Sequence, residues 1–228
     1  MLYLSRFARP DGHGSLHRYV MAGFPDDLGP DPRKQAGVLF RVQVNREPDF
    51  FAAENDNELI DKRECAEGGS ILVQSTMKPK WPKAYEAQVK LEFRHNLLNV
   101  GERYRFRFGL NSVAQSNRDG RCRRYPVPVS QWLAAREEML GATFDIRKVE
   151  SMVLYDHVRR EHYTRSFPIH VSVIDGYLRV TDPIKLADAI REGIGREKAY
   201  GCGLLSLLPV VAVTTPEPAP ALVGVAQG

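Results

Sequence analysis

A glycine-rich stretch near the C-terminus, GIGREKAYGCGLLSL, combines residue types that could hold an anion. Glycines lack a Cβ and let a ligand approach the backbone, while exposed N–H groups with Arg196 and Lys198 could bind a phosphate. A dinucleotide fingerprint does not fit, because Lys198 stands where the third glycine belongs and the loop follows a helix pattern instead of a strand. A Walker loop is also absent, since no G-K-[ST] occurs.

The same glycines have a structural interpretation that stays open at this point. Gly193 would cap the preceding helix, Gly195 would lie within the loop, and Gly201 and Gly203 would shape the turn into a final strand. Glycine is common at helix ends, so the pattern alone does not separate this interpretation from phosphate binding.

The six histidines include one, His17, that could transfer protons in RNA cleavage. It lies on a helix pattern beside the stripe of Leu16, Val20 and Phe24, so its ring can face an adjoining cleft. In cleavage by a neighbouring 2′-hydroxyl, one group takes a proton and another donates one, and imidazole suits both tasks near neutral pH. A histidine on a short helix can equally be a surface or core residue, and His13 is a weaker competitor. No His or Cys spacing typical of a metal site and no G-x-S-x-G is present.

Arginines gather in the second half of the chain, which carries the whole excess of basic over acidic residues. We expect one cluster in a long loop and a second in another loop-like stretch; a strand pattern holds further arginines on one face. Such clusters suit a polyanion, although solvated surface charge explains any one of them equally well. The clusters are Arg121, Arg123 and Arg124; Arg159 and Arg160; and Arg105 and Arg107, with Arg103 beside them.

Composition indicates a globular chain of 228 residues with a net charge of +4. It is long enough for one large or two small domains with a buried core. Three cysteines at wide spacing indicate neither disulfides nor a metal site, and no signal or membrane-spanning pattern occurs. We expect a cytoplasmic protein with no membrane association.

The hydrophobic patterns predict two successive β-α-β-β-α-β units that position these residues. The sequence therefore predicts an α+β fold of two tandem ferredoxin-like domains, residues 1–97 and 98–212, with a disordered tail at 213–228. Strands are expected at 1–8, 37–44, 70–77, 89–94, 102–110, 143–155 and 202–210, and a hairpin-like strand segment at 169–182. Helices are expected over 15–24, 130–140 with Ser130 as N-cap, and 183–194, with only weak helix between 78 and 88.

Several stretches resemble the CRISPR RNA-processing endoribonucleases of the type I-E system, the CasE family. The most specific is GIGREKAYGCGLLSLLP, and the resemblance covers residues 1 to about 210. The others are MLYLSR, LHRYVMAGFPD, ILVQS followed by P-x-W, RFRFGLN and R-C-R-R-Y-P-V-P.

The resemblance implies a metal-independent endoribonuclease without a cofactor. It would bind the stem-loop of a CRISPR repeat transcript, cut once at the 3′ base of the stem, leave a 2′,3′-cyclic phosphate, and stay with the mature crRNA and the other subunits of the Cascade complex. The family's catalytic histidine, eight residues before a proline, matches His17 before Pro25. The family's tyrosine three residues before it is replaced by Gly14, and Arg18 or Tyr19 are candidate substitutes.

With the resemblance, the glycine-rich loop is expected along the RNA backbone, with phosphate and shape contacts dominating. The residues expected to contact RNA are Arg18, Arg105, Arg107, Arg121, Arg123, Arg124, Arg159, Arg160, Gly193, Gly195, Arg196 and Lys198. A non-catalytic scaffold that only holds the guide RNA hairpin is the competing hypothesis, which the missing tyrosine makes conceivable. A tandem RNA-recognition module of another purpose is weaker, because the strand aromatics alternate with arginine and resemble core residues.

Overall fold

The computed structural model describes residues 1–9, 15–43, 69–92, 98–118, 121–160 and 163–210. The predictions about His13, Gly14 and the tail at 213–228 fall outside these described residues.

The first sheet has the strand arrangement of a ferredoxin-like fold. Its four antiparallel strands lie in the order β2-β3-β1-β4, so the first strand of the unit is central and the fourth lies at an edge. Only a 3-10 turn stands where a second long helix was weakly expected, in a segment with two prolines. The elements are β1 (Leu2–Ala8), α1 (Leu16–Met21), α2 (Pro32–Gln35), β2 (Leu39–Gln43), β3 (Ser70–Ser75), η1 (Lys83–Tyr85) and β4 (Gln88–Glu92).

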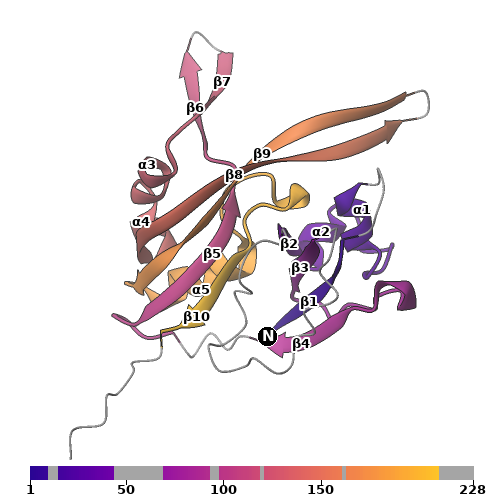
Figure 1. Cartoon of the computed structure of the whole chain (residues 1–228), viewed down its shortest axis with the longest axis horizontal. Helices are drawn as coiled ribbons and strands as arrows, with labels where there is room; N and C mark the ends of the chain where they lie inside the picture. Colours follow the sequence, from indigo (N-terminus) through magenta and orange to yellow (C-terminus); the bar gives the residue numbers. More distant parts are fainter. Residues whose placement is uncertain (10–14, 44–68, 93–97, 119–120, 161–162, 211–228) are drawn as a thin grey trace, which may run out of the picture.

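The second sheet repeats the arrangement, with the order β10-β5-β9-β8. The expected helix over 130–140 is interrupted at Arg136, and its N-cap is Pro128 instead of Ser130. Asp182 caps α5, because its side chain accepts hydrogen bonds from the amides of Ile184 and Lys185. The elements are β5 (Arg103–Leu110), α3 (Val129–Ala134), α4 (Glu137–Leu140), β8 (Ala142–Arg160), β9 (Tyr163–Val180), α5 (Pro183–Glu192), η3 (Lys198–Tyr200) and β10 (Leu205–Pro209). The predicted α+β, tandem ferredoxin-like class is confirmed (Figure 1).

The prediction of a hairpin-like segment at 169–182 is wrong. Asp175 and Gly176, a typical hairpin pair, lie inside the continuous strand β9. The pairing with β8 shifts register between Ile146 and Lys148, directly opposite Gly176. A Cβ on Gly176 would stand 2.2 Å from the carbonyl oxygen of Asp145, so this glycine serves a close strand approach instead of a turn.

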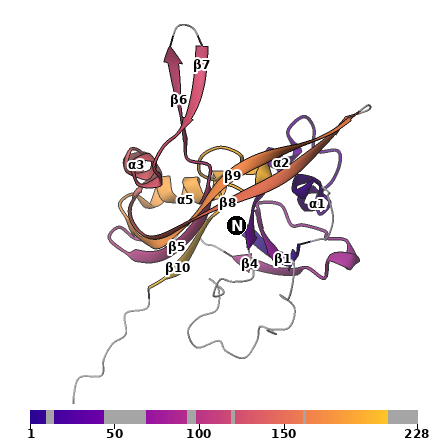
Figure 2. The ribbon, with the colours of Figure 1, turned by 45° about the horizontal axis from the view of Figure 1, so that its top comes forward.

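The arginine-rich stretches are strands, which corrects two expected loops. The strands β6 (Val113–Arg118) and β7 (Arg121–Pro126) pair as a separate two-stranded hairpin, which projects away from the body of the molecule (Figures 1 and 2). Arg159 and Arg160 belong to β8, where their backbones pair with Thr164 and Tyr163. Alternating apolar residues are sparse in both stretches, which is why the sequence pattern did not reveal the strands.

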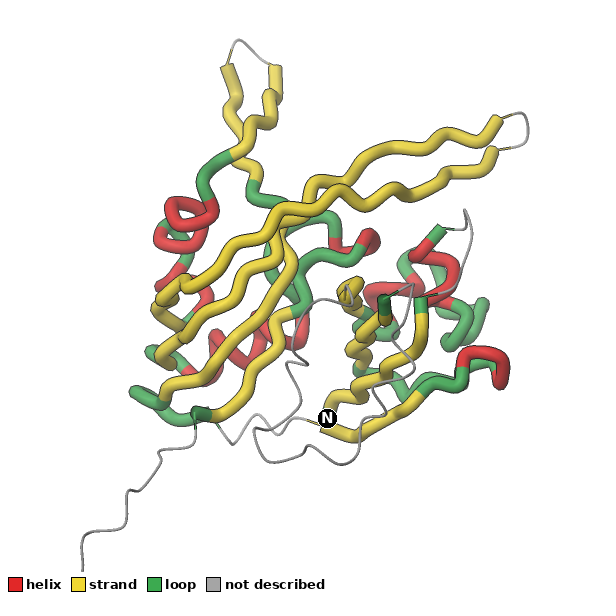
Figure 3. Tube along the Cα trace, in the orientation of Figure 1, coloured by secondary structure: helices red, strands yellow, loops and turns green. Residues whose placement is uncertain are grey.

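The two units share part of their cores. One apolar cluster lies between the second sheet and helices α3 to α5 and includes Phe106, Phe108 and Leu186. A second cluster joins α1 and the first sheet to residues of the outer parts of β8 and β9, including Leu154 and Ile169. The long strand pair thus reaches over the N-terminal unit, as Figure 3 also shows.

A buried arginine ties the units together. Arg41 of β2 is 2% exposed, and its Nη1 donates to the carbonyl oxygens of Arg107 and Leu204 and to the Ser206 hydroxyl. Gln74 of β3 donates to the carbonyl of Ile190 at the end of α5, 2.7 Å away. These bonds fix how the first sheet meets β5 and β10, because breaking one would leave a buried polar group without its partner. No helix among the described residues is long and apolar enough to cross a membrane.

Candidate active site and nucleic-acid interface

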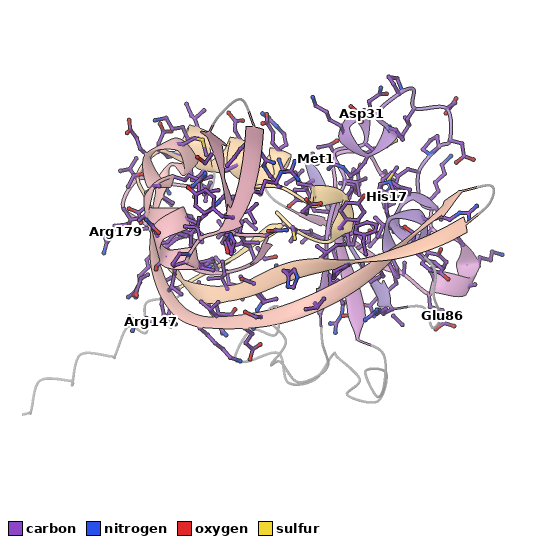
Figure 4. All side chains as sticks on the ribbon, turned by 90° about the horizontal axis from the view of Figure 1, so that it is seen from above. Met1, His17, Asp31, Glu86, Arg147 and Arg179 are labelled. Carbon is purple, nitrogen blue, oxygen red and sulfur yellow. The ribbon has the colours of Figure 1, made fainter. Side chains whose placement is uncertain are left out.

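Helix α1 carries His17 at its start. Leu16 and Val20 are buried on the core side, which places the half-buried imidazole beside the core stripe as the sequence predicts. The Nδ1 atom of this ring is shielded from solvent. His17 lies on the N-terminal unit, whereas Arg147 and Arg179 lie on the opposite side of the molecule (Figure 4).

The glycine-rich loop is a connection between α5 and β10 whose glycines adopt left-handed backbone angles. Gly193 ends α5 with φ of +79°, and a Cβ there would lie 2.5 Å from Leu39 Cδ2 on the first sheet. Gly201 has φ of +93° and packs against Phe40. The structural role expected for Gly193 is therefore confirmed, and the glycines also allow the two units to approach closely.

Several loop amides are already used within the protein. Ile194 donates to the carbonyl of Gly203, Gly203 donates to that of Gly109, and Tyr200 and Cys202 both donate to that of Glu197. These N–H groups are not available to an anion, so a phosphate at this loop would rely mainly on side-chain cations. Phosphate binding by Gly193 and Gly195 stays a prediction.

The loop lies next to the helix of His17. Its 3-10 turn, η3, contacts both α1 and β2. Tyr200 of this turn packs edge-on against Phe167 of β9, with ring centroids 5.3 Å apart. The contact thus brings together two elements that carry His17 and Lys198, residues about 180 positions apart in sequence.

Lys198 belongs to a small basic cluster that the sequence did not reveal. Its Nζ donates to the carbonyl oxygen of Glu192, 2.8 Å away, and Arg33 of α2 similarly donates to the carbonyl of Val38 at 2.9 Å. Burial lowers the pKa of Lys198, and the nearby positive charges of Arg33 and Lys34 lower it further, against an opposing effect of Glu192. Burial also lowers the pKa of Arg33, although Asp31 opposes this. Three cations, Arg33, Lys34 and Lys198, thus lie near one another with Asp31 and Glu192 beside them, and an anionic ligand would relieve their mutual repulsion.

The only sequence signal that Arg33 and Lys34 belong to a basic cluster is that they are adjacent, in the stretch D-P-R-K. That signal is weak, because nothing local connects α2 with a loop more than 160 residues later.

Arg196 joins the glycine-rich loop to the β6–β7 hairpin. Its exposed guanidinium donates to Gln115 Oε1 of β6, 2.6 Å away. In the hairpin, Gln115 is the backbone partner of Arg124, whose side chain is exposed. The loop and the arginine-rich hairpin are therefore adjacent, as a shared RNA surface requires. Arg121 and Arg123 belong to the same strand, and their contacts with RNA remain a prediction.

Arg107 is not a surface cation, which corrects its expected role in RNA binding. Its side chain is 3% exposed and forms a bidentate ion pair with Asp175, with N–O distances of 2.7 and 2.8 Å. The N-terminal unit covers this part of the sheet face through Arg41. Arg105, two residues earlier on the same face, is exposed, as is Arg103. Of the three arginines on this strand, Arg103 and Arg105 therefore lie at the surface as the alternation predicts, and Arg107 does not.

The candidate substitutes for the missing tyrosine differ in position. Arg18 is exposed on α1 next to His17. Arg18 lies one residue and Tyr19 two residues from His17, and neither spacing places the side chain on the helix face of the histidine. The Tyr19 ring lies against Tyr85 of η1, with centroids 6.4 Å apart. Tyr19 is thus turned toward η1, whereas the exposed Arg18 has no such ring contact among the described residues, and the substitute for the tyrosine stays open between them.

The described residues contain no group of three or more His, Cys, Asp or Glu side chains arranged to hold a metal ion. Metal-independent chemistry stays a prediction on this point.

Comparisons with known proteins agree with the expected family. The family model described as "CRISPR associated protein" matches residues 5–209. The CRISPR system Cascade subunit CasE of Escherichia coli is 27% identical over 164 residues, which cover 66% of this chain and 80% of that protein. The CRISPR-associated endoribonuclease Cse3 of Thermus thermophilus is 29% identical over 155 residues, 61% of this chain and 72% of that protein.

Solved structures share the fold over almost the whole chain. The structure of Thermus thermophilus Cse3 bound to an RNA representing a pre-cleavage complex has a TM-score of 0.61 at 23% identity and covers 91% of this chain and 99% of its own. Escherichia coli Cas6e has a TM-score of 0.58 at 23% identity and covers 92% and 100%. Together with the family match, these findings confirm the resemblance to CasE proteins that the sequence predicts. The chain belongs to the family of CRISPR-associated proteins.

Proposed function

We propose that the chain is an endoribonuclease that binds the stem-loop of a CRISPR repeat transcript and processes precursor CRISPR RNA. The relatives named CasE and Cse3, one of them solved with RNA in a pre-cleavage complex, support this assignment. The observation that carries it is the contact between α1, with His17, and the loop that holds Lys198. The finer proposal is a single cut at the 3′ base of the stem, in the cytoplasm, with the product kept as part of the Cascade complex.

The proposed reaction uses the RNA's own nucleophile. The 2′-oxygen next to the scissile phosphate forms a bond to phosphorus, the bond from phosphorus to the 5′-oxygen breaks, and the products are a 2′,3′-cyclic phosphate and a 5′-hydroxyl. The proton leaves the 2′-hydroxyl for a base, and the 5′-oxygen receives one from an acid. His17 performs one of these transfers, since imidazole exchanges protons readily near neutral pH.

The cations around α1 would stabilise the charge that develops on phosphorus. Lys198 and Arg33 are held by carbonyls at short distance, so little reorganisation is needed when a phosphate arrives. Arg18 next to the histidine and Arg196 at the hairpin would extend this positive surface along the RNA. Phosphate contacts of this kind position the duplex without reading its sequence.

The proposal is tested by single-turnover cleavage of the repeat hairpin in excess EDTA, with the 3′ end of the product analysed. We expect one cut at the stem base. The terminal phosphate of the product should resist phosphatase until acid opens the 2′,3′-cyclic phosphate to a monoester. Cleavage that requires an added divalent cation would contradict the metal-independent route.

The scaffold hypothesis makes a different prediction in the same assay. It expects hairpin binding that weakens with salt, as the endoribonuclease does, but no cut under any condition. Binding without cleavage would therefore replace the proposed activity with a holding role.

A further inference from the structure

A short segment before β4 carries three exposed lysines within six residues. In this lysine segment (residues 78–85), Lys78, Lys80 and Lys83 are exposed, while Pro79 between the first two is buried. Among the described residues none of the three forms an ion pair with a carboxylate. The only acidic residue between positions 76 and 90 is Glu86. Among the described residues, the segment therefore presents an excess of positive charge.

The lysine segment is fixed to the end of the helix that carries His17. The amide of Lys80 donates to the carbonyl of Gly23, 2.7 Å away. The Trp81 ring lies so close to Gly23 that a Cβ there would come within 2.6 Å of it, and it packs against Phe24 at 5.7 Å. The lysines are thus displayed from a backbone that is held in place against α1.

A half-exposed aromatic ring ends the segment. Tyr85 stacks on Trp81 with an interplanar angle of 24° and also lies 5.1 Å from Phe7 and 6.4 Å from Tyr19. The three neighbouring rings restrict the orientation of the Tyr85 ring. A positively charged track beside a fixed aromatic ring is the combination that binds single-stranded nucleic acid, with phosphates on the cations and a base on the ring.

We infer that the lysine segment binds single-stranded RNA adjoining the repeat stem, next to the scissile bond. This inference rests on the proposed function, which places the stem base at α1. Another protein subunit fits the surface less well, because lysine is depleted in the buried parts of protein interfaces. The single strand could be the one leading into the stem or the one leading away from it, and both present the same phosphates and bases.

The test compares three RNAs: the hairpin alone, the hairpin with a 5′ single-stranded extension, and the hairpin with a 3′ extension. Affinities are measured at several salt concentrations with the full chain carrying His17→Ala, so that the RNA stays intact. We expect an extension to tighten binding on the order of tenfold, and the 5′ and 3′ arms show which strand is held.

The variant K78Q/K80Q/K83Q should lose this gain while binding the hairpin alone as before. Its salt dependence on extended RNA, as the slope of log affinity against log salt, should fall by about 2, because each single-strand phosphate contact contributes about 0.7. The matched control R147Q/K185Q/R191Q removes the same charge from exposed positions on the C-terminal unit and should keep the gain.

Two results would overturn the inference alone: no gain from either extension, or a gain that survives in the lysine variant. Equal losses in the lysine variant and its control would also overturn it, because net charge would then explain the effect. Failure of the parent chain to bind the hairpin at all would refute the proposed function, and the inference with it.

Discussion

Removing Arg107 should destabilise the protein strongly, although the residue resembles a surface RNA ligand in the sequence. Its bidentate partner Asp175 is only 12% exposed in the side chain. At about 4 Å between charge centres and an effective dielectric constant of about 20, the attraction is about 4 kcal/mol. Arg107→Met leaves the carboxylate buried without its cation, and breaking such a pair costs about 3–5 kcal/mol.

Urea denaturation measures this cost, and a double variant separates its origin. In R107M/D175V both charges are gone, so we expect most of the stability to return, to within about 1 kcal/mol of the parent. The folded double variant should bind the repeat hairpin with unchanged salt dependence, because Arg107 touches no phosphate in this account.

A loss below about 1 kcal/mol in Arg107→Met would refute the argument that the ion pair is structural. A double variant that folds but binds RNA with a smaller salt slope would refute it from the other direction, since that result identifies a phosphate contact.

Three further predictions concern the glycine-rich loop. Gly193→Ala should lower the free energy of unfolding by about 1–3 kcal/mol in urea titration, because φ of +79° strains any other residue; an unchanged value would contradict the close contact with Leu39. Cys202 should resist iodoacetamide at pH 8 in the folded protein and react fully in urea, as peptide mass mapping can show, because burial, with a smaller contribution from Glu197, raises the pKa of its thiol to about 12; rapid native labelling would argue against this burial. Lys198→Met should leave the free energy of unfolding at neutral pH unchanged or higher. Burial is the main cause that lowers the pKa of Lys198 in the folded state, so folding with a charged Lys198 is destabilising at any pH below the folded-state pKa. This destabilisation disappears as the pH rises above the unfolded-state pKa. The same variant should lower the salt slope of hairpin binding by about 1, and an unaltered slope would exclude Lys198 as a phosphate contact.

The fold class was predictable because both units carry regular signals. Apolar strands such as ILVQS and the capped helix from Pro183 fix the order of elements, and repetition of that order identifies the tandem arrangement. The long reach of β8 and β9 was not predictable, because residues such as Leu154 and Ile169 pack on the other unit, and no local pattern reveals such a distant partner. The continuous course of β9 through Asp175 and Gly176 was not predictable either, because the close approach of β8 determines the backbone there.

The candidate site was predictable only where a local pattern or a family motif marks it. His17 and the glycine-rich loop belong to such motifs, and the structure shows that their elements, α1 and η3, are in contact. The burial of Arg107 depends on Arg41 and Asp175, which are distant in sequence, so strand alternation alone placed it wrongly on the surface. The cluster of Lys198 with Arg33 depends on the same kind of long-range packing.

The rate of hairpin cleavage by His17→Ala tests the central claim most directly. The parent chain, His17→Ala and the control His170→Ala, which alters an exposed histidine on β9, would be compared under single-turnover conditions with binding measured for each. We expect His17→Ala to bind the hairpin normally and to cut at least about 100-fold more slowly, and His170→Ala to cut like the parent. Normal cleavage by His17→Ala would contradict the proposed role of His17.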